Sequence, residues 1–246
     1  MRASVPDTAP PRIYVLAGVN GAGKSSVGGA MLEEAGVTFY NPDTAAREFR
    51  LKLPEIGQEE ANGLAWQEGR RLLERAIDER KDFAFETTLG GNTMASLLEK
   101  GSAAGIEVRI WYVGLESADL HIARVRSRVG LGGHDIPEAK IRERYARSRM
   151  KLIELLPHLA ELKVFDNTEE GDPQKGQAPS PKLLLHMKWG KIVSSADLSR
   201  VPPWAKPILQ AAIESSGKSL QASARPEEAR RRNRRGYLRG FAKRRF

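Results

Sequence analysis

The stretch that decides the fold is Ile13-Tyr-Val-Leu-Ala17, followed directly by Gly18-Val-Asn-Gly-Ala-Gly-Lys-Ser25. The second part matches the pattern G-x-x-x-x-G-K-[ST] without a mismatch. The apolar run predicts a buried strand, and residues 25–35 predict a helix that ends near Gly36. Between a strand and a helix, such glycines let backbone N–H groups surround phosphate oxygens at the positive end of the helix dipole. The sequence therefore predicts a phosphate-binding loop.

The pattern gives roles to individual residues of this loop. The Lys24 ammonium would reach the β- and γ-phosphates of ATP, and the Ser25 hydroxyl would ligate Mg²⁺. ATP and Mg²⁺ are thus the predicted cofactors. We expect ATP to contact Gly18, Asn20, Gly21, Ala22, Gly23, Lys24, Ser25 and Ser26.

Strand and helix patterns alternate along residues 12–168. Strand patterns follow the first one at 38–41, 83–86, 107–114 and 162–166. Helical patterns lie at 44–51, 55–80, 93–104, 116–129 and 137–156. In 55–80 the predicted buried face holds Ile56, Leu64, Leu72, Ala76 and Ile77. Alternating strands that are apolar on both faces favour an α/β fold, here a three-layer P-loop NTPase/kinase fold with about five parallel strands and a helical lid.

The ends of the chain differ from this kinase domain. Residues 1–11 predict a flexible N-terminus, and 169–220 a small C-terminal extension that begins with a polar linker. Within the extension, 182–193 predicts a hairpin about Lys188-Trp-Gly190, and 204–215 a last helix. The composition of 221–246 is that of a disordered basic tail.

The positive charge is concentrated in that tail. The chain has 40 Lys and Arg against 31 Asp and Glu, a net charge of +9. Residues 225–246 hold ten of the bases and two of the acids, which leaves 30 bases and 29 acids in residues 1–224. A nearly neutral body disfavours an extended nucleic-acid track. The tail itself either contacts an anionic partner or acts as a solubilising end.

Several classes of protein are disfavoured by what the sequence lacks. There is no cysteine, which excludes disulfides, thiolate zinc sites and a cysteine nucleophile. The four histidines have no metal-ligand spacing. No apolar run approaches the roughly 18 residues of a membrane span, and the N-terminus has no signal-peptide core. We therefore expect a cytoplasmic protein without a membrane span.

An acidic residue follows the second predicted strand. Asp43 lies just after Asn41, at the edge of the sheet where the phosphate loop also ends and where open α/β sheets bind ligands. A carboxylate there can accept the proton of an attacking hydroxyl, which suits phosphoryl transfer to an alcohol. Alternatively, Asp43 is the N-cap of the helix at 44–51.

The third predicted strand ends in Glu86-Thr87-Thr88. Many P-loop proteins carry an acid there, and Glu86 could hold a Mg²⁺-bound water or a substrate hydroxyl. The alternative is a carboxylate at the sheet edge that accepts hydrogen bonds from nearby backbone N–H groups. We take Glu86, Thr87 and Thr88 as candidate substrate-binding residues.

The segment 124–149 is rich in basic residues, and its connection at 129–136 is rich in glycine. Such a connection is typical of a closing lid. Arg124 and Arg128, one helical turn apart, would then stabilise the transferring phosphoryl group. The alternative is a solvated helix face. His134, within the connection, is a candidate for a hydrogen bond to substrate or for one that folds the loop.

Five stretches in this order resemble the zeta-toxin family of P-loop kinases: Gly18–Ser26, Asn41-Pro-Asp43, Phe85-Glu-Thr-Thr88, Arg124–Pro137 and Phe165-Asp-Asn167. The resemblance covers about residues 12–168 and is closest to the shorter, stand-alone branch. It implies a kinase of the 3′-hydroxyl of the aminosugar in UDP-N-acetylglucosamine or a related UDP-sugar. It also implies ATP and Mg²⁺ at Lys24 and Ser25, a general base at Asp43, substrate contacts at Glu86 and Thr88, and lid arginines at 124 and 128.

The chain departs from the family pattern at a few positions. Ser26 stands where threonine is more usual, Gly90 where serine is common, and Glu143 and Lys151 differ on the last helix. These departures bear on substrate preference more than on ATP binding, and an antitoxin partner is not identified. The competing interpretations are a nucleoside or polynucleotide 5′-hydroxyl kinase and a nucleic-acid-binding P-loop ATPase that uses the basic tail.

Overall fold

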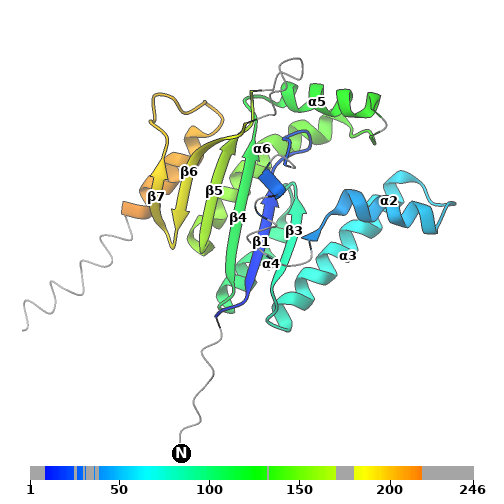
Figure 1. Cartoon of the computed structure of the whole chain (residues 1–246), viewed down its shortest axis with the longest axis horizontal. Helices are drawn as coiled ribbons and strands as arrows, with labels where there is room; N and C mark the ends of the chain where they lie inside the picture. The colour runs from blue at the N-terminus through cyan, green and yellow to red at the C-terminus, as the bar shows by residue number, and fades with distance from the viewer. Residues whose placement is uncertain are drawn as a thin grey trace, which may run out of the picture.

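A computed structural model of the chain describes residues 9–24, 27–29, 31, 36, 39–131, 133–169 and 180–217. The described strands form one seven-stranded sheet in the order β2-β3-β1-β4-β5-β6-β7 (Figure 1). They are β1 (Arg12–Ala17), β2 (Phe39–Tyr40), β3 (Phe83–Thr87), β4 (Glu107–Gly114), β5 (Glu161–Asp166), β6 (Lys182–Lys188) and β7 (Lys191–Ser195). The first five in chain order pair in parallel. The predicted α/β fold with about five parallel strands is confirmed.

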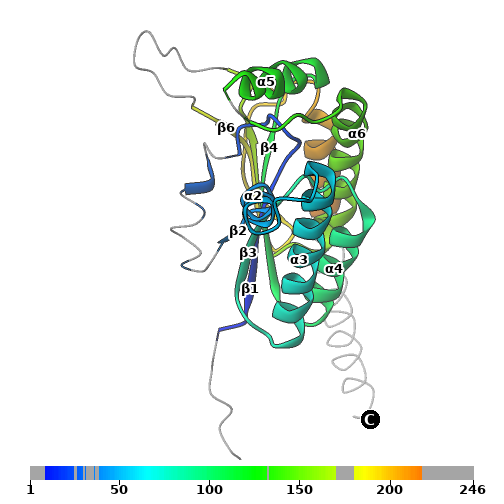
Figure 2. The same cartoon turned by 90° about the vertical axis from the view of Figure 1, so that its right-hand side faces the viewer.

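Helices cover the two faces and the carboxyl end of the sheet. They are α2 (Pro42–Lys52), α3 (Gln58–Asp78), α4 (Asn92–Ala103), α5 (Ala118–Gly130), α6 (Glu138–Leu155) and a last helix at 206–217. A 3-10 turn, η1 (Leu156–His158), follows α6. Figure 2 shows α3, α4 and α6 on one face, and α5 beyond the carboxyl ends of the strands. On the other face, Val27 and Met31 pack with Tyr14 and Trp111.

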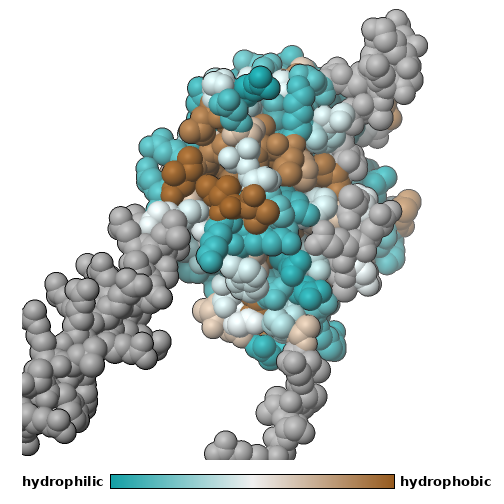
Figure 3. All heavy atoms as spheres, turned by 60° about the vertical axis from the view of Figure 1, so that its left-hand side comes forward, coloured by the Kyte–Doolittle hydropathy of each residue, from teal (hydrophilic) through white to brown (hydrophobic). Residues whose placement is uncertain are grey.

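The predicted hairpin is the antiparallel edge of the same sheet. β6 pairs with β5 and β7 with β6, both antiparallel. The last helix packs into the main core through Ile208 and Leu209, together with Val164 of β5. Residues 182–217 therefore share the hydrophobic core of the parallel strands. Figure 3, turned so that the β7 side comes forward, shows apolar surface on that side, where Leu183 and Val193 are exposed.

The buried stripe of α3 differs from the predicted one. The buried residues near its start and middle are Ala61, Ala65 and Gly69, whereas the predicted Leu64 and Leu72 are only half-buried. Small residues let neighbours approach closely: a Cβ at Gly69 would lie 2.7 Å from the Tyr40 ring. The Tyr40 hydroxyl donates to the backbone oxygen of Ala65 at 2.5 Å. The first half of α3 therefore packs through small side chains, and the buried leucine of the helix is Leu73, not the predicted Leu64 or Leu72.

Some predictions fall outside the described residues. These are the contacts of Ser25 and Ser26, most of the helix expected at 25–35, the linker after residue 169, and the basic tail at 221–246. Among the residues that the structure describes, no helix is long and apolar enough to cross a membrane.

Candidate active site

The glycine-rich loop after β1 has a conformation that only glycine supports. Gly18, Gly21 and Gly23 have φ angles of 146°, 81° and 74°. A Cβ on Gly18 would lie 2.3 Å from the backbone oxygen of Val113, and one on Gly21 2.5 Å from that of His121. The loop thus fits tightly between β4 and α5. This backbone geometry, with Lys24 at its end, fits the phosphates of a nucleotide.

Lys24 lies in the loop with its charge already balanced. Its side chain is 8% exposed, and Nζ donates to the Gly18 oxygen at 2.8 Å. Glu86 at the end of β3 brings Oε1 to 3.2 Å from Nζ. The other Glu86 oxygen accepts from Asn41 Nδ2 at 3.2 Å. The network joins the loop, β3 and the start of α2, so residues from three strand ends meet at one place.

Asp43 does not cap α2. The N-cap is Asn41, whose side-chain oxygen accepts from the backbone N–H groups of Asp43 and Thr44 at 2.8 and 3.1 Å. The alternative of Asp43 as N-cap is therefore wrong. Its carboxylate instead faces the connection between α5 and α6, 3.7 Å from Arg128 Nη1 and 3.9 Å from His134 Nε2. The Asp43 carboxylate is free of a capping role and can take part in chemistry.

The two arginines of the predicted lid have different surroundings. Arg128 faces Asp43, and its Nε and Nη2 are buried without a hydrogen-bond partner among the described residues. Arg124 donates to the backbone oxygens of Asn167 and Thr168 at 2.9 and 3.0 Å. Arg124 therefore braces the turn after β5, while Arg128 is the arginine beside the candidate base.

A cavity of about 630 Å³ opens beside the loop. Asn20 of the loop forms one part of its lining, α3 contributes Trp66, and α6 contributes Arg144. The lining includes every residue predicted to bind substrate: Asp43, Glu86, Thr87, Thr88 and His134. The carboxyl ends of parallel strands meet at one edge, which explains why residues distant in sequence line one cavity.

Arg144 is a cavity residue that the sequence did not assign to the site. Its Nη1 donates to Asn20 Oδ1 at 2.7 Å, and burial lowers the pKa of the guanidinium. Arginine stays charged at neutral pH, so Arg144 places a partly desolvated positive charge between the loop and the cavity. The basic composition of 124–149 was the signal, but the face of α6 that turns inward was not evident from it.

His121 also supports the loop and was missed. It is 1% exposed, and its Nδ1 lies 2.9 Å from the backbone oxygen of Asn20. Burial lowers the pKa of this imidazole to about 4, and the positive charges of Lys24 and Arg124 act in the same direction. His121 is therefore neutral at pH 7 and donates to the loop from Nδ1. The helical pattern predicted at 116–129 did not by itself indicate a role for this histidine.

The pKa of His121 predicts that acid destabilises the fold. An unfolded histidine binds a proton below its ordinary pKa of 6.5, whereas the folded one does so only near 4. The free energy of unfolding should thus fall as the pH drops from about 6.5 to about 4. Urea unfolding at several pH values measures the slope. His121→Asn, which keeps a donor but cannot titrate, should show a smaller slope over this range, and equal slopes would contradict the assignment.

Comparison with known proteins adds to this geometry. The family described as "Zeta toxin" matches residues 1–170. An uncharacterized protein of Haemophilus influenzae is 28% identical over 128 residues, which cover 52% of this chain and 88% of that protein.

Two solved structures have a similar fold. A chain of the PezAT toxin–antitoxin system of Streptococcus pneumoniae superposes with a TM-score of 0.53 at 13% identity, over 89% of this chain and 91% of that one. A chain of the AvrRxo1-ORF1:-ORF2 structure with ATP gives a TM-score of 0.56 at 14% identity over 84% of this chain. This chain spans only 64% of that chain's length.

Proposed function

The chain belongs to the zeta toxin family of P-loop kinases, and on that premise we propose that it is an ATP-dependent phosphotransferase that acts on a hydroxyl of a small metabolite. The observation that carries the proposal is the position of Asp43: its carboxylate lines the cavity that adjoins the glycine-rich loop and lies beside Arg128. The glycine-rich loop, the candidate base Asp43 and the cation Arg128 thus lie together at one edge of the sheet.

ATP is the phosphoryl donor that suits this loop. The close packing of Gly18 and Gly21 leaves no room for side chains at these two positions, so backbone N–H groups of the loop can approach the phosphates. Lys24 would bind the β- and γ-phosphates of ATP. Its contact with Glu86 would then be replaced by contacts with the phosphates. Mg²⁺, held by the Ser25 hydroxyl, would neutralise charge on the phosphates. The structure of AvrRxo1-ORF1:-ORF2 with ATP is consistent with this choice.

The residues in and beside the cavity would have different roles in the transfer. The acceptor oxygen attacks the γ-phosphorus, the bond from that phosphorus to the ADP oxygen breaks, and the hydroxyl proton passes to Asp43. Two buried N–H groups of Arg128 have no hydrogen-bond partner in the part of the chain that the structure describes, and they can donate to the transferring phosphoryl group. Glu86 and His134 would orient the acceptor hydroxyl from the cavity wall.

We propose as acceptor the 3′-hydroxyl of the aminosugar in UDP-N-acetylglucosamine or a related UDP-sugar. The cavity combines aromatic side chains, Trp66 and Tyr40, with cations, Lys140 and Arg144. Aromatic side chains can stack on a planar base, and cations can pair with a diphosphate. ATP as co-substrate favours a cytoplasmic location. Because residues 221–246 are strongly basic, we also propose that they contact an anionic partner.

Trp66→Ala tests the acceptor cavity. Trp66 is 44% exposed and lines the cavity, whereas Trp189 at the β6–β7 turn is 65% exposed and lies outside it. Loss of a stacking ring typically costs 1–3 kcal/mol, so Trp66→Ala should weaken UDP-N-acetylglucosamine binding about tenfold. Calorimetric titration of the sugar nucleotide measures the Kd, with Trp189→Ala as the matched control. An unchanged Kd in Trp66→Ala would argue against this acceptor site.

A further inference from the structure

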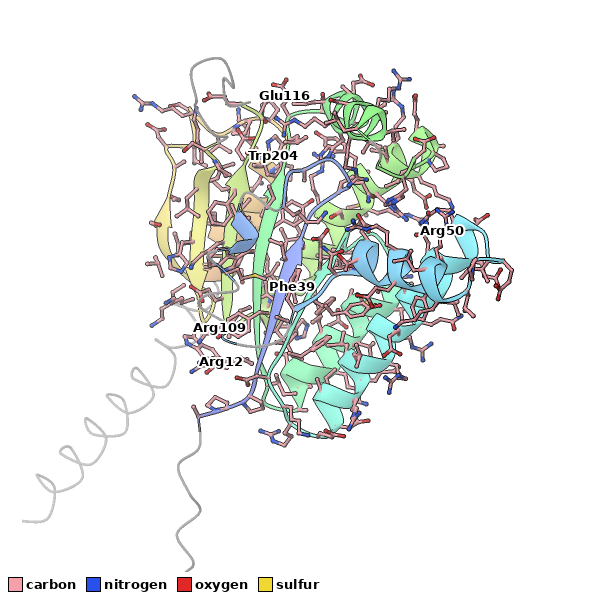
Figure 4. All side chains as sticks on the ribbon, turned by 45° about the vertical axis from the view of Figure 1, so that its right-hand side comes forward. Arg12, Phe39, Arg50, Arg109, Glu116 and Trp204 are labelled. Atoms are coloured by element: carbon pink, nitrogen blue, oxygen red, sulfur yellow. The ribbon has the colours of Figure 1, made fainter. Side chains whose placement is uncertain are left out.

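Trp204, which precedes the last helix, lies against the end of β4. Its side chain is 3% exposed, and its ring centroid is 6.3 Å from that of Tyr112. A Cβ on Gly114 would come within 2.4 Å of the indole ring, so the indole occupies the place that a side chain at Gly114 would take. Figure 4 labels Trp204 near the carboxyl ends of the strands, the end at which α5 lies. Trp204 therefore lies at the same end of the sheet as the glycine-rich loop.

The indole N–H connects Trp204 to the loop through the turn after β5. Nε1 donates to Asp166 Oδ1 at 3.2 Å, and the same oxygen accepts from the Thr168 hydroxyl at 2.5 Å. Asn167, between these two residues, donates its backbone N–H to the Gly114 oxygen at 3.0 Å. Its side-chain Nδ2 donates to the backbone oxygen of Ala22 at 2.9 Å and is buried. The turn that Trp204 holds thus fixes one side of the loop.

A second set of contacts runs from the same residue through α6. Arg149 donates to the Trp204 backbone oxygen at 3.3 Å and lies 4.1 Å over the Tyr145 ring. Tyr145 in turn meets the His121 ring edge-on at 5.6 Å between centroids. His121 Nδ1 is 2.9 Å from the Asn20 backbone oxygen. The two sets of contacts reach the loop at Asn20 and Ala22, on either side of Gly21.

We propose that Trp204 is a positioning residue for the glycine-rich loop, so that one residue outside the parallel strands contributes to nucleotide binding. The inference rests on the proposed function, because ATP is the ligand that the loop would hold. Trp204 is not among the residues that line the cavity, and its described contacts are with β4, α6 and the end of β5. It acts by keeping the Ala22 and Asn20 carbonyls in place, which directs the neighbouring N–H groups at the phosphates.

The test measures ATP affinity in Trp204→Phe, which keeps an aromatic ring but loses the indole N–H. Loss of one hydrogen bond in the network should raise the Kd of Mg²⁺-ATP about fivefold. The affinity for UDP-N-acetylglucosamine should stay within about twofold of wild type, because Trp204 does not line the cavity. Calorimetric titration at a temperature well below the Tm of every variant gives both constants.

Leu209→Ala is the matched control. Leu209 lies in the last helix, is 1% exposed and packs in the same core as Trp204. Its truncation should lower the Tm, because it leaves a cavity in the core, yet leave the ATP Kd unchanged. A Kd in Trp204→Phe no higher than that in Leu209→Ala would overturn the proposal. If Trp204→Phe does not fold, Arg149→Met replaces it, because this substitution removes the second set of contacts. An ATP Kd in Arg149→Met no higher than that in Leu209→Ala would then overturn the proposal.

The possible outcomes distinguish a failure of this inference from a failure of the proposed function. A wild-type chain that does not bind Mg²⁺-ATP contradicts the proposed function and this inference together. A wild-type chain that binds Mg²⁺-ATP, with Trp204→Phe binding it equally well, contradicts the inference alone.

Discussion

Lys24→Ala is expected to lower the rate of phosphoryl transfer by about a thousandfold or more while the chain stays folded. Lys24 is the one described cation that contacts both the glycine-rich loop and a carboxylate of the cavity wall, through Gly18 and Glu86. It would neutralise charge that builds up on the β- and γ-phosphates. Initial rates of ADP formation in the presence of acceptor, with thermal unfolding alongside, measure the effect.

The control for Lys24→Ala uses Glu86, which loses its ion-pair partner in that variant. Without Lys24, the half-buried Glu86 carboxylate keeps the Asn41 contact as its one hydrogen bond among the described residues, and an unpaired charge is destabilising. Adding Glu86→Gln should therefore recover the Tm lost in Lys24→Ala but none of the lost rate. Kinase activity that survives in folded Lys24→Ala would defeat the assignment of this loop to ATP.

Asp43→Asn is expected to reduce kcat by about 10²–10⁴-fold, the usual cost of removing a positioned base. The amide keeps the size of the side chain but cannot take up a proton near neutral pH. Because Asn41 is the N-cap, the substitution leaves the cap intact. It removes only a favourable acid from the first turn of α2, so the Tm should change little. The Kd for ATP should stay within a few fold of wild type.

Asp135→Asn is the matched control for Asp43→Asn. Asp135 lines the same cavity, but its carboxylate accepts from the backbone N–H of Ile136 and is in the connection before α6. Loss of that carboxylate should leave turnover near normal. A folded Asp43→Asn enzyme with turnover like that of Asp135→Asn would remove Asp43 from the mechanism.

Much of the fold follows from local signals in the sequence. The strand β1 that precedes the glycine-rich loop, and the bounds of β4 at Glu107–Gly114, are as predicted. Strands buried on both faces appear in the sequence as short apolar runs, and glycines mark the loop. The grouping of Asp43, Glu86 and His134 in one cavity also follows, because all lie after strands or helices that end at the same edge.

The contacts that support the loop did not follow from the sequence. His121 is a polar residue in an apolar stripe, and its partner Asn20 lies about a hundred residues earlier in the chain. Trp204 meets Gly114 and Asp166 from the far end of the chain. The cap of α2 was assigned to Asp43 as one alternative because aspartate and asparagine are equally good caps, and only the backbone geometry selects Asn41. Long-range packing decides the contacts of His121 and Trp204, whereas local backbone geometry decides the cap of α2.

The central claim is that the chain transfers a phosphoryl group from ATP to a hydroxyl of a small metabolite. The most direct measurement incubates the protein with Mg²⁺-ATP and a panel of UDP-sugars, nucleosides and 5′-hydroxyl oligonucleotides, followed by mass spectrometry of the panel, with Lys24→Ala as the blank. We predict that UDP-N-acetylglucosamine or a related UDP-sugar gains the mass of one phosphoryl group in step with ADP formation. Hydrolysis of ATP to ADP and inorganic phosphate, with every member of the panel unchanged, would contradict the claim.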